Sequence, residues 1–214
     1  MQKVYFISGL GADERAFSYL DLSFCEPVFI RWIRPLEDET VPAYAARLKE
    51  QIPEAAPTIV GLSFGGMVAV EIAKAFPYKK IVLLSSAKTQ QEIPFYLKTM
   101  RWLPLHKLAT PAFLKAANQF AYKLMGISRR PDKVLFMKML MQADEVFIKW
   151  AVDRIINWRN NSIPARTIHI HGTKDILLPY AFVKPDYTVK GGVHLMVMNR
   201  PAEISALLRE CISI

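Results

Sequence analysis

The sequence predicts an α/β fold, in which a mostly parallel sheet of six strands is flanked by helices. Short runs of almost continuous apolar residues alternate along the chain with segments whose apolar residues recur at helical spacing. Unbroken apolar runs are typical of strands that are buried on both faces, as in a parallel sheet. Alternation of such strands with helices implies right-handed crossover connections. One long segment breaks this alternation and predicts a helical insertion.

The first predicted strand is KVYFIS at residues 3–8, a run rich in β-branched and aromatic residues that ends at Gly9. Such residues are enriched in strands, and glycine weakens a strand and commonly ends it. Five further runs have the same character, although the last is less regular. They lie at residues 27–33, 57–63, 79–86, 166–172 and 186–191.

Helices are predicted between several of these strands. Residues 41–52 have apolar positions at helical spacing and Pro42 near the start. Residues 64–76 form a second helical pattern that stops before Pro77. The pattern at 199–211 has Pro201 in its first turn, where the missing N–H of proline costs nothing.

The interruption spans residues 88–160, between the fourth and fifth predicted strands, and contains no convincing strand pattern. It predicts three or four helices punctuated by Pro104, Pro111, Gly126 and Pro131. We therefore expect one α/β core, made of residues 1–87 and 161–214, with residues 88–160 inserted over one end of the sheet. The insertion is rich in large apolar residues, which predict either packing within it or an adaptable apolar pocket. These residues are Met137, Met139, Met141, Trp102, Trp150 and Trp158.

Composition and length agree with a single globular domain. The chain has 214 residues, of which 52% are hydrophobic, and no apolar run reaches the roughly 18 residues that span a bilayer. The first eleven residues have none of the features of a secretory leader, so a cytoplasmic protein is expected. Cys25 and Cys211 are far apart in sequence and predict buried thiols, with a disulfide or a metal pair as the alternative.

The positive charge is concentrated in the insertion. The chain has a formal net charge of +9, and residues 88–160 contain 13 Lys or Arg against 5 Asp or Glu. Such a segment attracts nucleic acid, an anionic membrane surface or an anionic substrate, or it is simply a solvated helix face. The sequence contains no nucleic-acid-binding motif, so we expect no nucleic-acid partner and no stable membrane insertion.

A serine surrounded by glycines marks the junction of the third strand with the following helix. The stretch GLSFGG places Ser63 between Gly61 and Gly65, with Gly66 next. A nucleophile at such a tight turn projects beyond its strand, and small neighbours are needed because helix and strand approach closely. The N-terminus of the following helix also favours negative charge near the serine. The pattern predicts a nucleophilic serine.

A nucleophilic serine needs a base, and four histidines are available. His194 lies between the last strand and the last helix, where it is either structural or the catalytic base. His169 and His171 alternate within a predicted strand and are expected to pack there. His106 lies in the insertion and is expected at its surface or between its helices. Position at the end of the sheet favours His194.

The orienting acid is expected after the fifth strand, in HIHGTKDILLP. Asp175 lies in this loop, where an aspartate commonly forms a turn or caps a helix. The segment after the fourth strand, LLSSAK, offers no carboxylate, which favours Asp175 as the catalytic acid. The resulting order of Ser63, Asp175 and His194 is the chain order of the α/β-hydrolase triad.

The chain resembles the α/β-hydrolase superfamily along its whole length, through GLSFGG, HGTKD, GGVHLM and the first-strand loop SGLGAD. Six strands correspond to a compact member without extra leading strands, and the insertion matches the position of the variable cap. The resemblance implies an oxyanion hole made of two backbone N–H groups, from Phe64 and from Leu10 in the first-strand loop. Ser8 departs from the histidine that relatives often have there.

The resemblance implies a carboxylesterase-like or thioesterase-like serine hydrolase, which forms an acyl-enzyme on Ser63 and needs no metal or organic cofactor. The expected substrate is a small-molecule ester or thioester with a small to medium, largely apolar acyl group, either neutral or anionic. Two alternatives stay open. One is acyl transfer, perhydrolysis or carbon–carbon bond hydrolysis on the same scaffold, and the other is non-catalytic binding of a small molecule. Fold alone does not assign a substrate.

Overall fold

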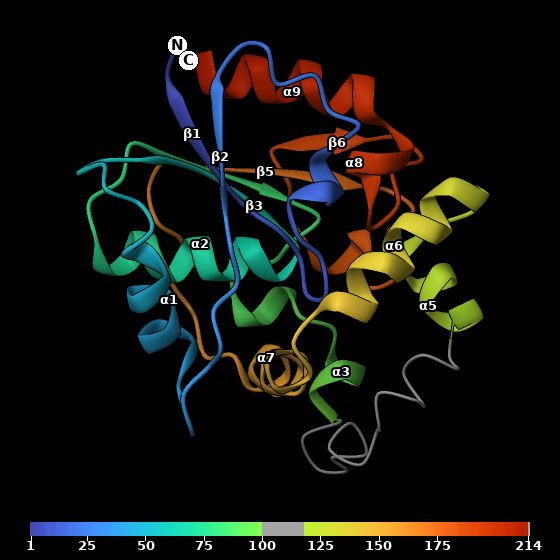
Figure 1. Cartoon of the computed structure of the whole chain (residues 1–214), viewed down its shortest axis with the longest axis horizontal. Helices are drawn as coiled ribbons and strands as arrows, with labels where there is room; N and C mark the ends of the chain where they lie inside the picture. Colours follow the sequence, from blue (N-terminus) through green and yellow to red (C-terminus); the bar gives the residue numbers. More distant parts are fainter. Residues whose placement is uncertain (100–117, 214) are drawn as a thin grey trace.

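The computed structural model describes residues 1–99 and 118–213, and its centre is a six-stranded sheet (Figure 1). The strand order is β2-β1-β3-β4-β5-β6, and every neighbouring pair is parallel. The predicted parallel α/β architecture is therefore confirmed. The strands are β1 (Lys3–Ile7), β2 (Glu26–Ile30), β3 (Thr58–Leu62), β4 (Lys80–Leu84), β5 (Thr167–Gly172) and β6 (Tyr187–Val189).

Helices cover both faces of the sheet, so the molecule has three layers (Figure 1). One face is covered by α1 (Val41–Lys49) and α2 (Phe64–Ala75), and the other by α9 (Pro201–Ser213), which follows the short α8 (Met196–Asn199). Successive residues of a strand contribute to opposite cores. In β1, for example, Val4 and Phe6 pack toward α9 while Tyr5 and Ile7 pack toward α1 and α2. This explains why the strands read as unbroken apolar runs.

The helix ends follow from local chemistry. Thr40 caps α1, because its Oγ1 accepts the Ala43 N–H at 3.3 Å, and Pro42 lies in the first turn. Helix α1 ends at Lys49, three residues before the predicted end, and α2 ends at Ala75, ahead of Pro77. Helix α9 begins at Pro201, as its first-turn proline indicates.

Between β4 and β5 the described residues form helices and no strand. They are the short 3₁₀ turn η2 (Gln90–Glu92) and the helices α3 (Phe95–Thr99), α5 (Asn118–Met125), α6 (Arg130–Gln142) and α7 (Glu145–Asn157). Pro131 lies in the first turn of α6, and Gly126 follows α5 with a φ of 71°. The division into a core and a cap over the sheet stays a prediction. Pro104, Pro111, Trp102 and His106 lie outside the described residues.

Two further expectations concern the chain as a whole. Cys25 and Cys211 are free and buried, as predicted, and burial raises the pKa of the Cys25 thiol to about 11. Within residues 1–99 and 118–213, the longest apolar helices are too short to cross a membrane.

Candidate active site

The three glycines beside Ser63 explain the shape of the turn between β3 and α2. A Cβ on Gly61 would overlap the backbone of Gly66, and one on Gly65 would overlap the carbonyl groups of Ile7 and Ser8 at the end of β1. A Cβ on Gly66 would overlap the side chain of Ser86. Only glycine lets the helix begin this close to the sheet.

Ser63 itself has a backbone conformation that non-glycine residues rarely adopt, with φ 52° and ψ −120°. Its neighbours hold it there. The Ser63 N–H donates to the Leu84 carbonyl at 2.9 Å, and the Ser86 hydroxyl donates to the Ser63 carbonyl at 2.6 Å. A strained residue of this kind persists only when its surroundings fix it, and such residues gather at functional sites.

The structure brings together the three residues that the sequence selects. His194 Nε2 lies 2.9 Å from Ser63 Oγ, and His194 Nδ1 lies 2.8 Å from Asp175 Oδ2. His194 and Asp175 are buried, whereas Ser63 is partly exposed. Burial raises the pKa of Asp175. The charge of His194, its hydrogen bond to the carboxylate and the charge of His171 lower that pKa, and on balance it lies below its ordinary value. Asp175 is therefore a carboxylate that accepts from Nδ1, which leaves Nε2 to accept from the serine hydroxyl.

Asp175 makes the contacts that both of its expected roles would require, a loop turn and an orienting acid. Its Oδ1 accepts the N–H groups of Leu177 and Leu178, each at 2.9 Å, which is the turn role expected of a loop aspartate. Its Oδ2 faces His194. Because one oxygen fixes the loop and the other faces the histidine, the orientation of the carboxylate is determined by its own backbone.

Two further histidines lie behind this carboxylate, and sequence analysis assigned them only to packing. His171 Nε2 lies 2.8 Å from the Leu178 carbonyl and 3.4 Å from Asp175 Oδ2. A carbonyl only accepts, so His171 carries its proton on Nε2, and its Nδ1 accepts from His169 Nε2 at 3.0 Å. Burial lowers the pKa of both rings. The signal available in the sequence was the spacing of two residues in a strand, which puts both rings on one face.

The loop after β1 lies beside the serine. A Cβ on Gly9 would be 3.9 Å from Ser63 Oγ, so the backbone of this loop passes close to the hydroxyl. Ser8, in place of the usual histidine, is buried and donates its hydroxyl to the Ala12 carbonyl at 2.8 Å. Among residues 1–99 and 118–213, the N–H groups of Leu10 and Phe64 donate to no acceptor. Both predicted oxyanion donors are therefore unpaired there.

Helices from the insertion contact the loops that carry these residues. The Leu195 N–H donates to the Met125 carbonyl at 3.2 Å, next to His194, and a Cβ on Gly126 would overlap Val193. A Cβ on Gly11 would overlap Leu140 of α6. Helices α5 and α6 thus support the histidine loop and the first-strand loop.

The large apolar residues of the insertion do not share one environment. Met139 and Trp158 are buried, and the Trp158 indole N–H donates to Glu71 Oε1 at 2.8 Å, so both belong to the packed interior. Met141 is 51% exposed, and Met137 and Trp150 are partly buried. Packing accounts for at least Met139 and Trp158.

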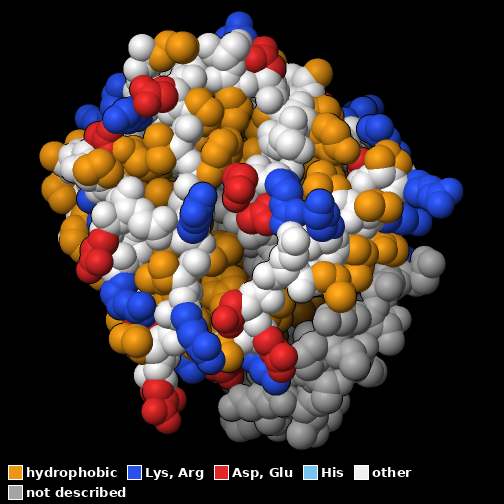
Figure 2. Space-filling view, in the orientation of Figure 1, with side chains coloured by type: hydrophobic (Ala, Val, Ile, Leu, Met, Phe, Trp, Pro, Cys, Tyr) orange, Lys and Arg blue, Asp and Glu red, His pale blue; other side chains and the backbone are white. Residues whose placement is uncertain are grey.

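Several basic residues of the insertion are paired with acids. Lys149 Nζ lies 2.6 Å from Glu145, and the Arg154 guanidinium lies 2.7 Å from Asp153. Arg129 is 64% exposed and lies 3.9 Å from Asp132. On the face shown in Figure 2, Lys and Arg are interspersed with Asp and Glu, and a group of them protrudes at the edge where α5 and α6 lie.

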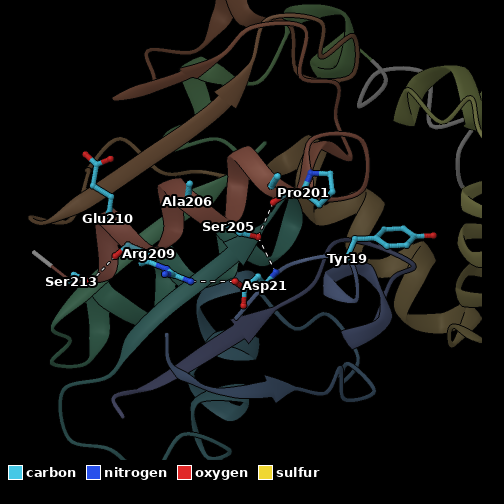
Figure 3. Close-up of a pocket in the computed structure, with 9 residues that line it drawn as sticks. Tyr19, Asp21, Pro201, Ser205, Ala206, Arg209, Glu210 and Ser213 are labelled. Carbon is cyan, nitrogen blue, oxygen red and sulfur yellow. Dashed lines mark hydrogen bonds and ion pairs between the residues drawn. The ribbon is translucent and has the colours of Figure 1, made fainter. Parts of the chain in front are cut away.

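A second serine, Ser205, also lies at a groove but has no base beside it among the described residues. Ser205 lies in an open groove of about 680 Å³ along α9, together with Tyr19, Asp21 and Arg209 (Figure 3). Its hydroxyl donates to the Pro201 carbonyl at 2.7 Å and accepts the Asp21 N–H at 2.9 Å, and none of the described residues that line the groove is a histidine. The described residues also hold no group of three or more His, Cys, Asp or Glu side chains suited to a metal ion.

Comparison with known proteins gives similarity in structure only. No family model matches the sequence, and no curated protein does. Among solved structures, a thermophilic esterase from Thermogutta terrifontis has a TM-score of 0.77 at 16% identity, covering 100% of this chain and 90% of its own. A bromoperoxidase from Bacillus anthracis has a TM-score of 0.74 at 16% identity, covering 100% and 92%. The chain has the α/β-hydrolase fold.

The likeness is one of fold and not of sequence. A variant of a meta-cleavage product hydrolase also matches, with a TM-score of 0.70 at 16% identity and coverage of 100% and 91%. These three proteins are described by three different activities. The α/β-hydrolase fold alone therefore does not assign an activity to this chain.

Proposed function

We propose that the protein is a serine hydrolase that cleaves an ester or thioester with a small to medium, largely apolar acyl group. One observation carries this proposal: the continuous hydrogen-bonded chain from Ser63 through His194 to Asp175, at 2.9 and 2.8 Å. A nucleophile, a base within hydrogen-bond reach and a third group that orients the base are the parts that acyl transfer requires.

The reaction follows from these positions. His194 Nε2 accepts the proton of Ser63 as Oγ attacks the carbonyl carbon of the substrate. The Nδ1–H of His194 keeps its bond to Asp175, which fixes the tautomer and stabilises the imidazolium that forms. The imidazolium then protonates the leaving alcohol or thiol. Water, deprotonated by His194, attacks the acyl-enzyme and releases the acid together with free Ser63.

The N–H groups of Phe64 and Leu10 are proposed to hold the oxyanion. Phe64 is the first residue of α2, so its N–H belongs to the positive end of the helix dipole. Preformed donors of this kind act on charge that develops in the transition state, and each is worth about 10²–10³ in kcat. The mechanism uses only side chains and peptide groups, with no cofactor.

A second reaction class has support from the comparisons. A bromoperoxidase and a meta-cleavage product hydrolase are among the similar structures, so perhydrolysis and carbon–carbon bond hydrolysis deserve direct assay. Both would use the same three side chains. Perhydrolysis differs from ester hydrolysis in the nucleophile that attacks the acyl-enzyme, and carbon–carbon bond hydrolysis differs in the leaving group. Product analysis therefore separates both from ester hydrolysis.

Labelling with a fluorophosphonate, followed by peptide mapping, tests the proposal. The reagent should modify Ser63, and Ser63→Ala should abolish both labelling and ester turnover while changing the free energy of unfolding by no more than about 1 kcal/mol. Ser23→Ala is the matched control, because Ser23 is exposed and precedes β2, at the amino ends of the parallel strands, whereas the triad residues follow the carboxyl ends. Absence of labelling in the folded parent would favour a non-catalytic binding protein.

A further inference from the structure

The Trp32 side chain, just beyond the end of β2, holds the loop that carries Leu10. Its indole N–H lies 3.1 Å from the Ala12 carbonyl and 3.3 Å from the Gly9 carbonyl, and both carbonyls accept it. The Ala12 N–H closes the same turn by donating to the Gly9 carbonyl at 3.1 Å. A single N–H group therefore binds both ends of the turn around Leu10.

This turn has little rigidity of its own. It contains Gly9 and Gly11, and Gly11 has a φ of 70°, a region that glycine enters freely. Glycine-containing loops lose more conformational freedom on folding than others, so bonds from outside are needed to fix them. Within residues 1–99 and 118–213, the side chains that donate to the carbonyls of this turn are Trp32 and Ser8, whose hydroxyl donates to Ala12.

The same indole ring also contacts Phe64, the residue that supplies the other unpaired N–H group. The two rings are stacked, with centroids 5.6 Å apart and planes at 28°. Trp32 also packs on Phe147 of α7 and on Tyr44 of α1, with ring centroids 4.7 Å and 6.2 Å apart. Phe64, Phe147 and Tyr44 are buried, so the ring rests on a close-packed base.

We infer that Trp32 is a positioning residue that fixes the N–H group of Leu10 relative to that of Phe64. The Trp32 indole N–H donates to the turn that contains Leu10, and the Trp32 ring packs on the ring of Phe64. The side chain therefore connects the two halves of the proposed oxyanion hole. This inference rests on the proposed function. Its physical basis is that a donor stabilises an oxyanion only at about 2.7–3.1 Å, so a loosened turn weakens transition-state binding more than substrate binding.

The test removes the indole N–H and keeps the ring. Benzothienylalanine has sulfur in place of the N–H group, and it is introduced at position 32 by nonsense suppression in the full chain. Trp150 is the matched control, because it belongs to the same aromatic cluster and donates its indole N–H to the Glu39 carbonyl at 2.8 Å, away from the turn. Tryptophan introduced at position 32 by the same suppression is the reference.

We expect the change at position 32 to lower kcat for an ester by about tenfold or more, with KM changing less than twofold. Affinity for a boronic acid that forms a tetrahedral adduct on Ser63 should fall in proportion to kcat/KM. The same change at position 150 should alter kcat less than twofold. Trp32→Phe should behave like the benzothienylalanine variant or worse.

Three results would overturn the inference. They are an unchanged kcat at position 32, an equal loss at positions 32 and 150, and a loss that falls only on KM. Failure of the proposed function looks different, because the reference protein with tryptophan at position 32 would then neither turn over esters nor take up a fluorophosphonate. That outcome overturns both proposals, whereas an active reference with an insensitive position 32 overturns this one alone.

Discussion

Replacing His169 by Gln should remove part of the acid sensitivity of the fold between pH 7 and pH 5, the remainder including that of His171. Burial, with the nearby His171 and Lys88, holds the pKa of His169 well below its ordinary value of about 6.5. The ring is therefore neutral in the folded protein at a pH where it is protonated in the unfolded chain. A histidine whose pKa is lower in the folded protein than in the unfolded chain contributes stability that is fully present above the unfolded pKa. That stability is lost as the pH falls below the unfolded pKa.

The magnitude follows from proton linkage. A histidine that binds a proton only in the unfolded chain changes the free energy of unfolding by up to about 1.4 kcal/mol per pH unit. From pH 7 to pH 5 the total for an unfolded pKa of about 6.5 is up to about 2 kcal/mol. A Gln amide can still donate to His171 Nδ1, as His169 Nε2 does at 3.0 Å, but it does not titrate.

Urea unfolding at pH 8, 7, 6 and 5, followed by tryptophan fluorescence, measures this difference. The His169→Gln variant should lose less stability than the parent below pH 7, and the two should run parallel from pH 8 to pH 7, which serves as the internal control. The m-value should be the same for both proteins if the folded states are equally compact. Parallel curves down to pH 5 would refute the claim that His169 is neutral in the folded protein.

Three other predictions concern the site and its surroundings. Asp175→Asn should lower kcat about 10⁴-fold by favouring the wrong His194 tautomer, as steady-state kinetics would show, and full activity would mean that another carboxylate orients His194. Gly65→Ala should prevent folding or cost several kcal/mol in urea unfolding, because its Cβ overlaps backbone at the end of β1, and a near-parental stability would contradict this. If the basic insertion attracts anions, added salt should lower kcat/KM more for a carboxylate-bearing ester than for a neutral ester. The double variant Arg129→Gln, Arg130→Gln should reproduce part of that fall. Equal salt dependence for the two esters would assign those charges to solvation alone.

The strands could be predicted because each one is encoded by a local run of apolar residues. The runs at 3–8, 57–63 and 79–86 became β1, β3 and β4 within two residues at each end. The run at 27–33 was predicted three residues too long, since β2 ends at Ile30. Trp32 and Ile33 lie beyond the strand and are apolar for a reason that periodicity does not show: the Trp32 indole N–H donates to the loop after β1.

Residues of the candidate site could be predicted only where the adjacent sequence, or their order along the chain, marks them. Ser63 has its glycines, and Asp175 and His194 follow strands in the expected order. His171 and Trp32 have no such signal, because their partners lie in other loops. His171 reaches Asp175 only after the loop following β5 folds back, and Trp32 meets Phe64 only when β1, β2 and β3 are side by side. Contacts of that kind are set by tertiary structure and not by local sequence.

A sheet of six strands is enough to build this constellation, and the strand order shows why. Leu10, Ser63, Asp175 and His194 follow β1, β3, β5 and β6, and all strands run the same way, so their carboxyl ends meet at one edge. Between β3 and β5 lies β4, whose following segment supplies Ser86 to hold the Ser63 carbonyl. Strand β2 contributes Trp32 from beside β1. Each of the six strands thus delivers one group to the site, and an additional strand beyond β2 would lie farther from Ser63 than β2 does.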